Sequence, residues 1–246
     1  MLAAGTAAQA TFSALLIGLP ALAPALRSQL GLSLHEVGAI LAATSVGLVL
    51  TLLPWGLAAD RVGERIVVTA GLLGAALALA AAAAVSSGPA LFVLLALAGA
   101  AGGAVNSGSG RAVMRWFPSG ERGLALGIRQ TAIPIGGAVA ALALPAIAEA
   151  ANVHWSFLAL ALACLGGAVV GAVFLRDPGG ERVLEVADPR TFADRRLWLL
   201  CAGSSLILVA QIAIIGFVVL FLNGAATSRL PLRPRCWPRS RSAAPH

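Results

Sequence analysis

The sequence has no lysine and no tyrosine, and only 11% of its 246 residues are charged. Soluble domains carry about 25% charged residues, so the shortage of charge excludes an ordinary water-soluble domain. Apolar residues make up 59% of the chain, and its mean hydropathy is +0.91. Most of the chain is therefore predicted to lie in lipid.

Histidine and cysteine are scarce, with three of each, and none falls in a metal-binding or redox spacing. The sequence also lacks a phosphate-binding glycine loop and a serine-nucleophile elbow. We therefore predict no enzyme activity, no metal site and no cofactor. Cys164 and Cys201 lie in apolar runs and Cys236 lies in the tail; we interpret them as small packing residues.

Seven apolar runs are each long enough to cross a bilayer core of about 30 Å as a helix. The runs show no period-two alternation, which favours helices over the strands of a barrel. The first run has no preceding basic residue and extends to about Leu26, so we interpret it as a span rather than a secretory signal. The predicted spans are 6–26, 37–57, 66–86, 89–112, 123–147, 155–175 and 197–222.

Arginine is distributed unequally between the predicted turns. Ten arginines follow the second, fourth and sixth spans, whereas the turns after the first, third and fifth spans hold only Arg27. Basic residues favour the cytoplasmic side. We therefore predict a multi-pass protein of the inner (plasma) membrane with a cytoplasmic N-terminus, and we assign the net charge of +7 to topology rather than to nucleic-acid binding. Predicted cytoplasmic turns are 58–65, 113–122 and 176–196, and predicted outer turns are 27–36, 86–89 and 148–154.

The chain is predicted to contain four parts. A six-span bundle over 1–175 is followed by a polar cytoplasmic linker over 176–196, a seventh span over 197–222 and an irregular tail over 223–246. The tail is rich in arginine and proline, and we hypothesise that it is read off-frame. The alternative is a native disordered tail.

The segment GLAADRVGER, residues 56–65, is a charged turn between two apolar spans. Glycine permits a tight reversal, and arginine anchors a turn to the inner leaflet. Asp60 is expected near the N-terminus of the following helix, where the helix dipole favours an acid. The spacing resembles the signature between the second and third helices of the major facilitator superfamily. The matching residues are Gly56, Asp60, Arg61, Gly63 and Arg65, whereas Ala58 and Glu64 depart from the pattern.

This resemblance implies the six-helix amino-terminal bundle of such a transporter, followed by a seventh transmembrane helix. It covers residues 1–222, the first half of a family that normally has twelve helices. Residues 106–147 resemble the fourth and fifth helices of its cyanate and nitrate/nitrite transporter-like branch. In the family, the signature Asp and Arg latch the two halves during alternating access, which implies this role for Asp60, Arg61 and Arg65.

The resemblance implies secondary-active or facilitative transport of a small solute, with an anion as one option. The implied partners are the lipid bilayer, the solute, and a missing carboxy-terminal half or another copy of the chain. The alternative is a truncated inactive product, or a membrane-embedded structural partner that transports nothing itself.

Polar residues inside the spans are the candidate solute ligands. Arg129 and Gln130 lie about 10 Å along the fifth span, where Arg129 could attract an anion while Gln130 and Thr131 supply hydrogen bonds. The alternative is that Arg129 extends to the inner interface. Asn106, in the fourth span, serves either helix packing or solute contact. Arg111 is either an interfacial anchor or a solute ligand.

Glycine and proline residues in the spans affect how the helices pack and bend. The pairs Gly99/Gly103, Gly123/Gly127 and Gly167/Gly171 have the spacing of helix-packing motifs. Proline removes a backbone donor and can kink a helix. The prolines concerned are Pro20, Pro24, Pro54, Pro134 and Pro145.

Overall fold

The computed structural model describes residues 1–118, 120–176, 194–208 and 210, and gives only the backbone for 109–116. The chain divides into two compact units, Met1–Leu184 and Glu185–His246. Every regular element of the described residues is helical, which confirms the all-α prediction. The elements of the first unit are α1 (Leu2–Gly18), η1 (Leu19–Leu22), α2 (Ala23–Leu30), α3 (Leu34–Val62), α4 (Glu64–Ala82), α5 (Gly88–Trp116), α6 (Arg122–Ala150) and α7 (Val153–Phe174).

Six helical segments of the described residues are long and apolar enough to cross a membrane. The first of them, Leu2–Leu30, joins α1, η1 and α2 into one span. The break within it is a 3₁₀ turn that has Pro20 in its first turn, as expected where a proline removes a backbone donor. Pro54, Pro134 and Pro145 instead lie inside α3 and α6.

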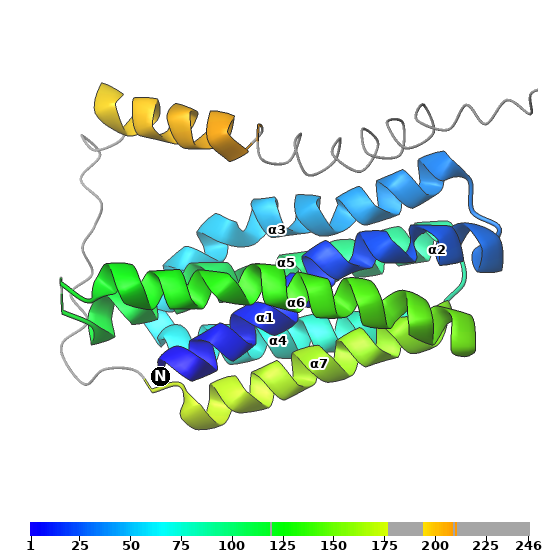
Figure 1. The fold of residues 1–246 in the computed structure, drawn as a ribbon, viewed down its shortest axis with the longest axis horizontal. Helices are drawn as coiled ribbons and strands as arrows, with labels where there is room; N and C mark the ends of the chain where they lie inside the picture. The colour runs from blue at the N-terminus through cyan, green and yellow to red at the C-terminus, as the bar shows by residue number, and fades with distance from the viewer. Residues whose placement is uncertain (119, 177–193, 209, 211–246) are drawn as a thin grey trace, which may run out of the picture. The chain divides into compact units, whose positions relative to one another are not determined.

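The helices form two groups around a shared interior (Figure 1). In one group α5 packs between α3 and α4, and in the other α1 packs against α6 and α7. Contacts of α4 with α7, and of α1 with α5, join the groups. Only 28% of the 18-residue apolar stretch of α3 and 33% of that of α6 are buried in the bundle. These are the smallest buried shares among the six spans.

Glycine allows several of these helices to touch through their backbones. A Cβ added to Gly47 or Gly99 would collide with a carbonyl oxygen on the facing helix, that of Ala96 or Thr44. Gly99 and Gly103 therefore pack α5 against α3, as their spacing predicted. Gly123 and Gly127 pack no described helix, because a Cβ on either would meet no described atom within 4 Å, so the prediction for this pair stays a prediction.

Most of the predicted turns are longer than the observed ones, whereas the turn predicted at 86–89 is observed at 83–87. The turn predicted at 58–65 shrinks to the single residue Gly63, and the one predicted at 148–154 shrinks to 151–152, because the helices continue beyond their apolar cores. Hydropathy marks only the part of a helix in hydrocarbon, whereas the hydrogen-bonded backbone continues into the polar interface.

Parts of the carboxy-terminal prediction cannot be compared. The predicted seventh span is helical over 197–208, and its remainder, apart from residue 210, lies outside the described residues. The same holds for linker residues 177–193 and for the tail 223–246. The four-part division of the chain therefore stays a prediction.

Candidate functional site

Arg129 lies on the buried side of α6. Buried residues of this helix recur at intervals of three or four, and the neighbours of Arg129 in that row are the small residues Ala125, Ala132 and Gly136. Its side chain is only 7% exposed. The guanidinium Nη2 donates a hydrogen bond of 2.8 Å to Oε1 of Gln9 on α1. This inward contact favours a partner inside the bundle over an arginine that extends to the interface.

Gln9 extends the contact into a polar cluster that involves three helices. Its Nε2 donates to Oδ1 of Asn106 on α5 at 3.1 Å and to Oγ of Ser13 at 3.5 Å. Arg129 Nη1 also donates to Oε1 of Gln130 at 3.3 Å. The structure thus brings together Arg129, Gln130 and Asn106, three of the five residues predicted as solute ligands. We call these three, with Gln9 and Ser13, the polar cluster.

Gln9 and Ser13 were missed by the sequence reasoning. Both are buried, although they stand in a helix composed mostly of alanine and leucine. The available signal was their spacing of four residues, which places two isolated polar side chains on the same face of one helix.

Thr131, a fourth predicted ligand, does not join the polar cluster. The exposed hydroxyl of Thr131 donates to the carbonyl oxygen of Ile128 in its own helix, at 2.6 Å. The side chain of Arg111 lies outside the described residues. Ser107, next to Asn106, donates to the carbonyl oxygen of Leu52 on α3 and so links two helices.

The charged motif of residues 56–65 adopts a different geometry from the one expected. Asp60 lies in the last turn of α3 rather than at a helix N-terminus, so the dipole argument for it is wrong. The argument applies instead to Glu64, the first residue of α4, which is 3% exposed. Gly63 alone connects the helices with φ 97° and ψ 160°, a conformation that residues with a side chain avoid.

The motif lies at the same end of the bundle as the N-terminus. The backbone N–H of Arg176, just after α7, lies 3.3 Å from Sδ of Met1. Because successive spans run in opposite directions, the α3–α4 and α5–α6 connections belong to this end, and Figure 1 shows the latter beside the N-terminus. Arg61, Arg65 and Arg122 therefore gather where the chain begins.

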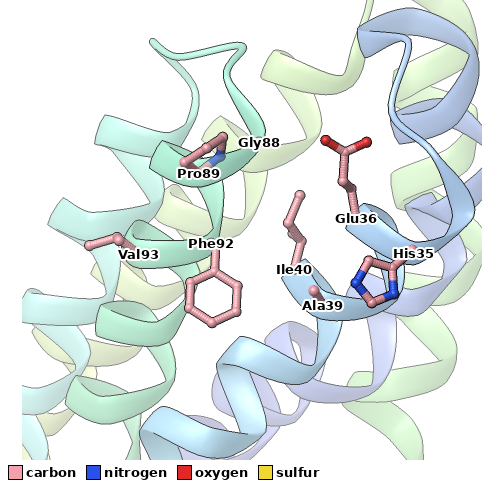
Figure 2. Close-up of a pocket in the computed structure, with 8 residues that line it drawn as sticks. All are labelled: His35, Glu36, Ala39, Ile40, Gly88, Pro89, Phe92 and Val93. Carbon is pink, nitrogen blue, oxygen red and sulfur yellow. The ribbon is translucent and has the colours of Figure 1, made fainter.

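The opposite end carries a separate cleft of about 390 Å³ between the first turns of α3 and α5. Figure 2 shows the ring of Phe92 and the side chain of Ile40 within it, with the Glu36 carboxylate near Gly88 at its rim. That carboxylate caps α3 by accepting hydrogen bonds from the backbone N–H and the hydroxyl of Ser33. The cleft contains no member of the polar cluster. No group of three metal-ligand side chains occurs among the residues described.

Comparisons with known proteins agree with this architecture. An uncharacterized MFS-type transporter of Mycobacterium tuberculosis, recorded from strains CDC 1551 and H37Rv, is 37% identical over 209 residues that cover 83% of this chain and 47% of the relative. The hexuronate transporter of Bacillus subtilis is 26% identical over 163 residues, or 66% of this chain and 39% of the relative. The chain thus spans about half the length, or less, of these curated relatives.

Solved structures share the fold at lower identity. A peptide transporter crystallised with sulfate is 20% identical, with a TM-score of 0.62 over 87% of this chain and 46% of that one. A D-xylose–proton symporter is 14% identical, with a TM-score of 0.58 over 89% of this chain and 55% of that one. The sequence model of the Major Facilitator Superfamily matches residues 2–234. The chain is therefore a multi-pass membrane protein that belongs to the Major Facilitator Superfamily, a family of solute transporters and not of enzymes.

Proposed function

We propose that this chain forms the amino-terminal half of a transporter that moves a small organic anion across the plasma membrane by alternating access. The observation that carries the proposal is the buried guanidinium of Arg129, held by the neutral side chains of Gln9 and Gln130. Both of these partners are neutral, so they orient the guanidinium and add no negative charge of their own. An anion that enters the bundle would therefore be attracted to it.

Energetics support a functional role for Arg129. An arginine at the centre of a transmembrane helix costs about 2.5–3.5 kcal/mol on insertion scales, and intramembrane charges generally face a cavity or a partner. A small residue at this position would preserve the packing row of α6 without that cost. Arginine also suits carboxylates, because its planar fork can donate two parallel hydrogen bonds to their oxygens.

The name of one relative supports the proposed class of solute. The hexuronate transporter carries the name of a sugar acid. A sugar acid combines a carboxylate, which would pair with Arg129, with hydroxyls that Gln130 and Asn106 could hydrogen-bond. Arg111 is proposed as either a further solute ligand or an interfacial anchor. Thr131 is proposed to reach the solute from the exposed side of α6.

A second six-helix half would complete the solute site. Transporters of this architecture hold the solute at the midplane, between two repeats. The exposed faces of α3 and α6 offer surface for that half, supplied either by a carboxy-terminal half or by another copy of the chain. The rival proposal is an inactive product or a structural membrane partner, which would bind no solute.

The arginine-rich end would face the cytoplasm, because basic turns prefer the inner side. The motif at that end would then act as the latch between halves, with Asp60, Arg61 and Arg65 as its polar members. Gly63 supports this role, since a one-residue connection holds α3 and α4 in a fixed relation. Gly56, in α3, completes the motif.

Binding of a sugar acid tests the function. The 246-residue chain, reconstituted in lipid nanodiscs, should bind glucuronate saturably, and Arg129→Gln should weaken binding about tenfold to hundredfold because a hydrogen bond to a charged group contributes about 1.5–3 kcal/mol. Arg122→Gln is the matched control, since Arg122 begins the same helix and donates to the carbonyl oxygen of Phe117. Equal loss in both variants, or binding by neither the wild type nor the variants, would reject the proposal.

A further inference from the structure

The cleft between α3 and α5 has the size and lining of a small-molecule site. Its volume of about 390 Å³ falls within the range of about 300–1,000 Å³ that such sites occupy. The ring of Phe92 and the side chain of Ile40 lie inside it (Figure 2). Toward their middles, the two helices touch through their backbones at Gly47 and Gly99. The cleft therefore lies where α3 and α5 separate toward their first turns.

Glu36 presents one carboxylate oxygen to the rim of this cleft. Its other oxygen, Oε2, is held by the backbone N–H and the hydroxyl of Ser33, at 2.8 and 2.7 Å. In the part of the chain described, Oε1 accepts no hydrogen bond, and it lies 3.8 Å from the place that a Cβ on Gly88 would take. Because Gly88 has no side chain, Oε1 stays accessible at the rim. Ser33 thus fixes the carboxylate while leaving one oxygen for a ligand.

The charges at the rim favour a cation as that ligand. The residues that line the cleft include the acid Glu36 and no arginine, and the chain has no lysine. The N-terminus of α3 favours the ionised carboxylate of Glu36 over its neutral acid. His35 adds an imidazole, whose neutral form has one acceptor nitrogen. A fitting ligand therefore donates hydrogen bonds from a positive group, while its apolar part packs against Phe92 and Ile40.

We propose that this cleft binds a small aromatic amine, whose ammonium group pairs with Glu36 and whose ring packs against Phe92. An ammonium forms a charge-assisted hydrogen bond with the carboxylate, which a neutral hydroxyl of the same size does not. Aromatic rings gain from offset or edge-to-face contact, so Phe92 favours an aromatic body. The volume, near the lower end of the range for small-molecule sites, fits a compact free amine better than a lipid with two acyl chains.

Binding of 2-phenylethylammonium to the 246-residue chain in phosphatidylcholine nanodiscs tests the site. Glu36→Gln should weaken it about threefold to fivefold, the upper part of the range for a pair that stays partly in solvent. Glutamine also serves in a capping box, so the contact with Ser33 and the start of α3 should be preserved. Uncharged 2-phenylethanol has the same body and should bind the wild type and Glu36→Gln alike.

Glu149→Gln is the matched control. Glu149 is an exposed acid in the last turn of α6, and it does not line the cleft. It lies at the same end of the bundle as Glu36, because the second and fifth spans run in opposite directions. Its replacement should leave the affinity for the ammonium unchanged. Equal loss in both glutamine variants would reduce the effect to the general charge of this end and overturn the site.

Ala39→Leu tests the cleft itself and covers the case in which Glu36→Gln does not fold. Ala39 lines the cleft, so a larger side chain there would fill it while Glu36 keeps its charge. Both the ammonium and the alcohol should then bind more weakly. Wild-type affinity for both in this variant would show that the ligand does not enter the cleft, and would overturn the proposal.

Two further measurements separate this site from a lipid site and from the anion site. Phosphatidylethanolamine in the nanodiscs should not compete with 2-phenylethylammonium; competition would assign the cleft to a lipid headgroup and overturn the free amine as its ligand. Arg129→Gln should leave amine binding unchanged, because no member of the polar cluster lines the cleft. Failure of glucuronate binding therefore leaves this proposal standing, whereas failure of the wild type to bind the amine overturns it alone.

Discussion

Replacing Gly136 by alanine should separate α6 from α1 directly beside the polar cluster. A Cβ added at Gly136 would collide with the carbonyl oxygen of Ala10, and it would lie 2.9 Å from that carbonyl carbon and 3.0 Å from the Ala10 Cα. A backbone cannot rotate away as the end of a flexible side chain can, so the helices must move apart. Gly127 in the same helix provides the control, because a Cβ there would meet no described atom within 4 Å.

The two substitutions share one energy term and differ in another. Each gains about 0.5–1 kcal/mol because alanine is a better helix residue than glycine. Only Gly136→Ala also carries the cost of overpacking, about 1–3 kcal/mol. The difference in unfolding free energy between the variants should therefore be about 1–3 kcal/mol, with Gly127→Ala the more stable. Thermal or denaturant unfolding of both proteins in one detergent measures it, and equal stabilities would refute the backbone contact.

Three further predictions concern topology, gating and completeness. A cysteine at Val62, in a variant without other cysteines, should react with an impermeant reagent only from the cytoplasmic side. Labelling of this cysteine in intact cells would show that the orientation is the opposite of the predicted one. Asp60→Asn should preserve insertion but slow transport once the chain is joined to a second half, because we propose that this acid serves the latch, and an acid at a helix C-terminus gains nothing from the dipole. A normal transport rate would leave Asp60 with a structural role only. The 246-residue chain alone should insert but show no counterflow of glucuronate, because a repeat half lacks the other wall of the solute site. Saturable counterflow that Arg129→Ala abolishes would show that one half is sufficient for transport.

The six spans of the bundle could be predicted from the sequence because hydropathy reports directly on the solvent around a helix. Their ends could not, since a helix such as α3 keeps its hydrogen-bonded backbone beyond the last apolar residue. The motif illustrates the consequence. Its spacing indicated a turn, yet all of it except Gly63 is helical, and this moves Asp60 from the start of one helix to the end of another.

The candidate site was only partly predictable for a related reason. An arginine in an apolar run is conspicuous, so Arg129 could be identified from composition alone. Its partner Gln9 lies 120 residues earlier in the chain, and no local pattern connects them. Likewise, Gly127 and Gly136 look alike in the sequence. They differ only in the fold, where Gly127 faces open space and Gly136 faces the backbone of α1 at Ala10.

Packing and binding are coupled at the junction of α1 and α6. Ala10, which contacts Gly136, is adjacent to Gln9, which accepts the 2.8 Å hydrogen bond from Arg129. Gly136 lies seven residues after Arg129, two helical turns along the same face of α6. A shift of α1 that accommodates a larger residue at 136 would also lengthen the contact of Gln9 with the guanidinium. Gly136→Ala should consequently weaken glucuronate binding as well as stability, whereas Gly127→Ala should leave binding near the wild-type value and raise stability by about 0.5–1 kcal/mol.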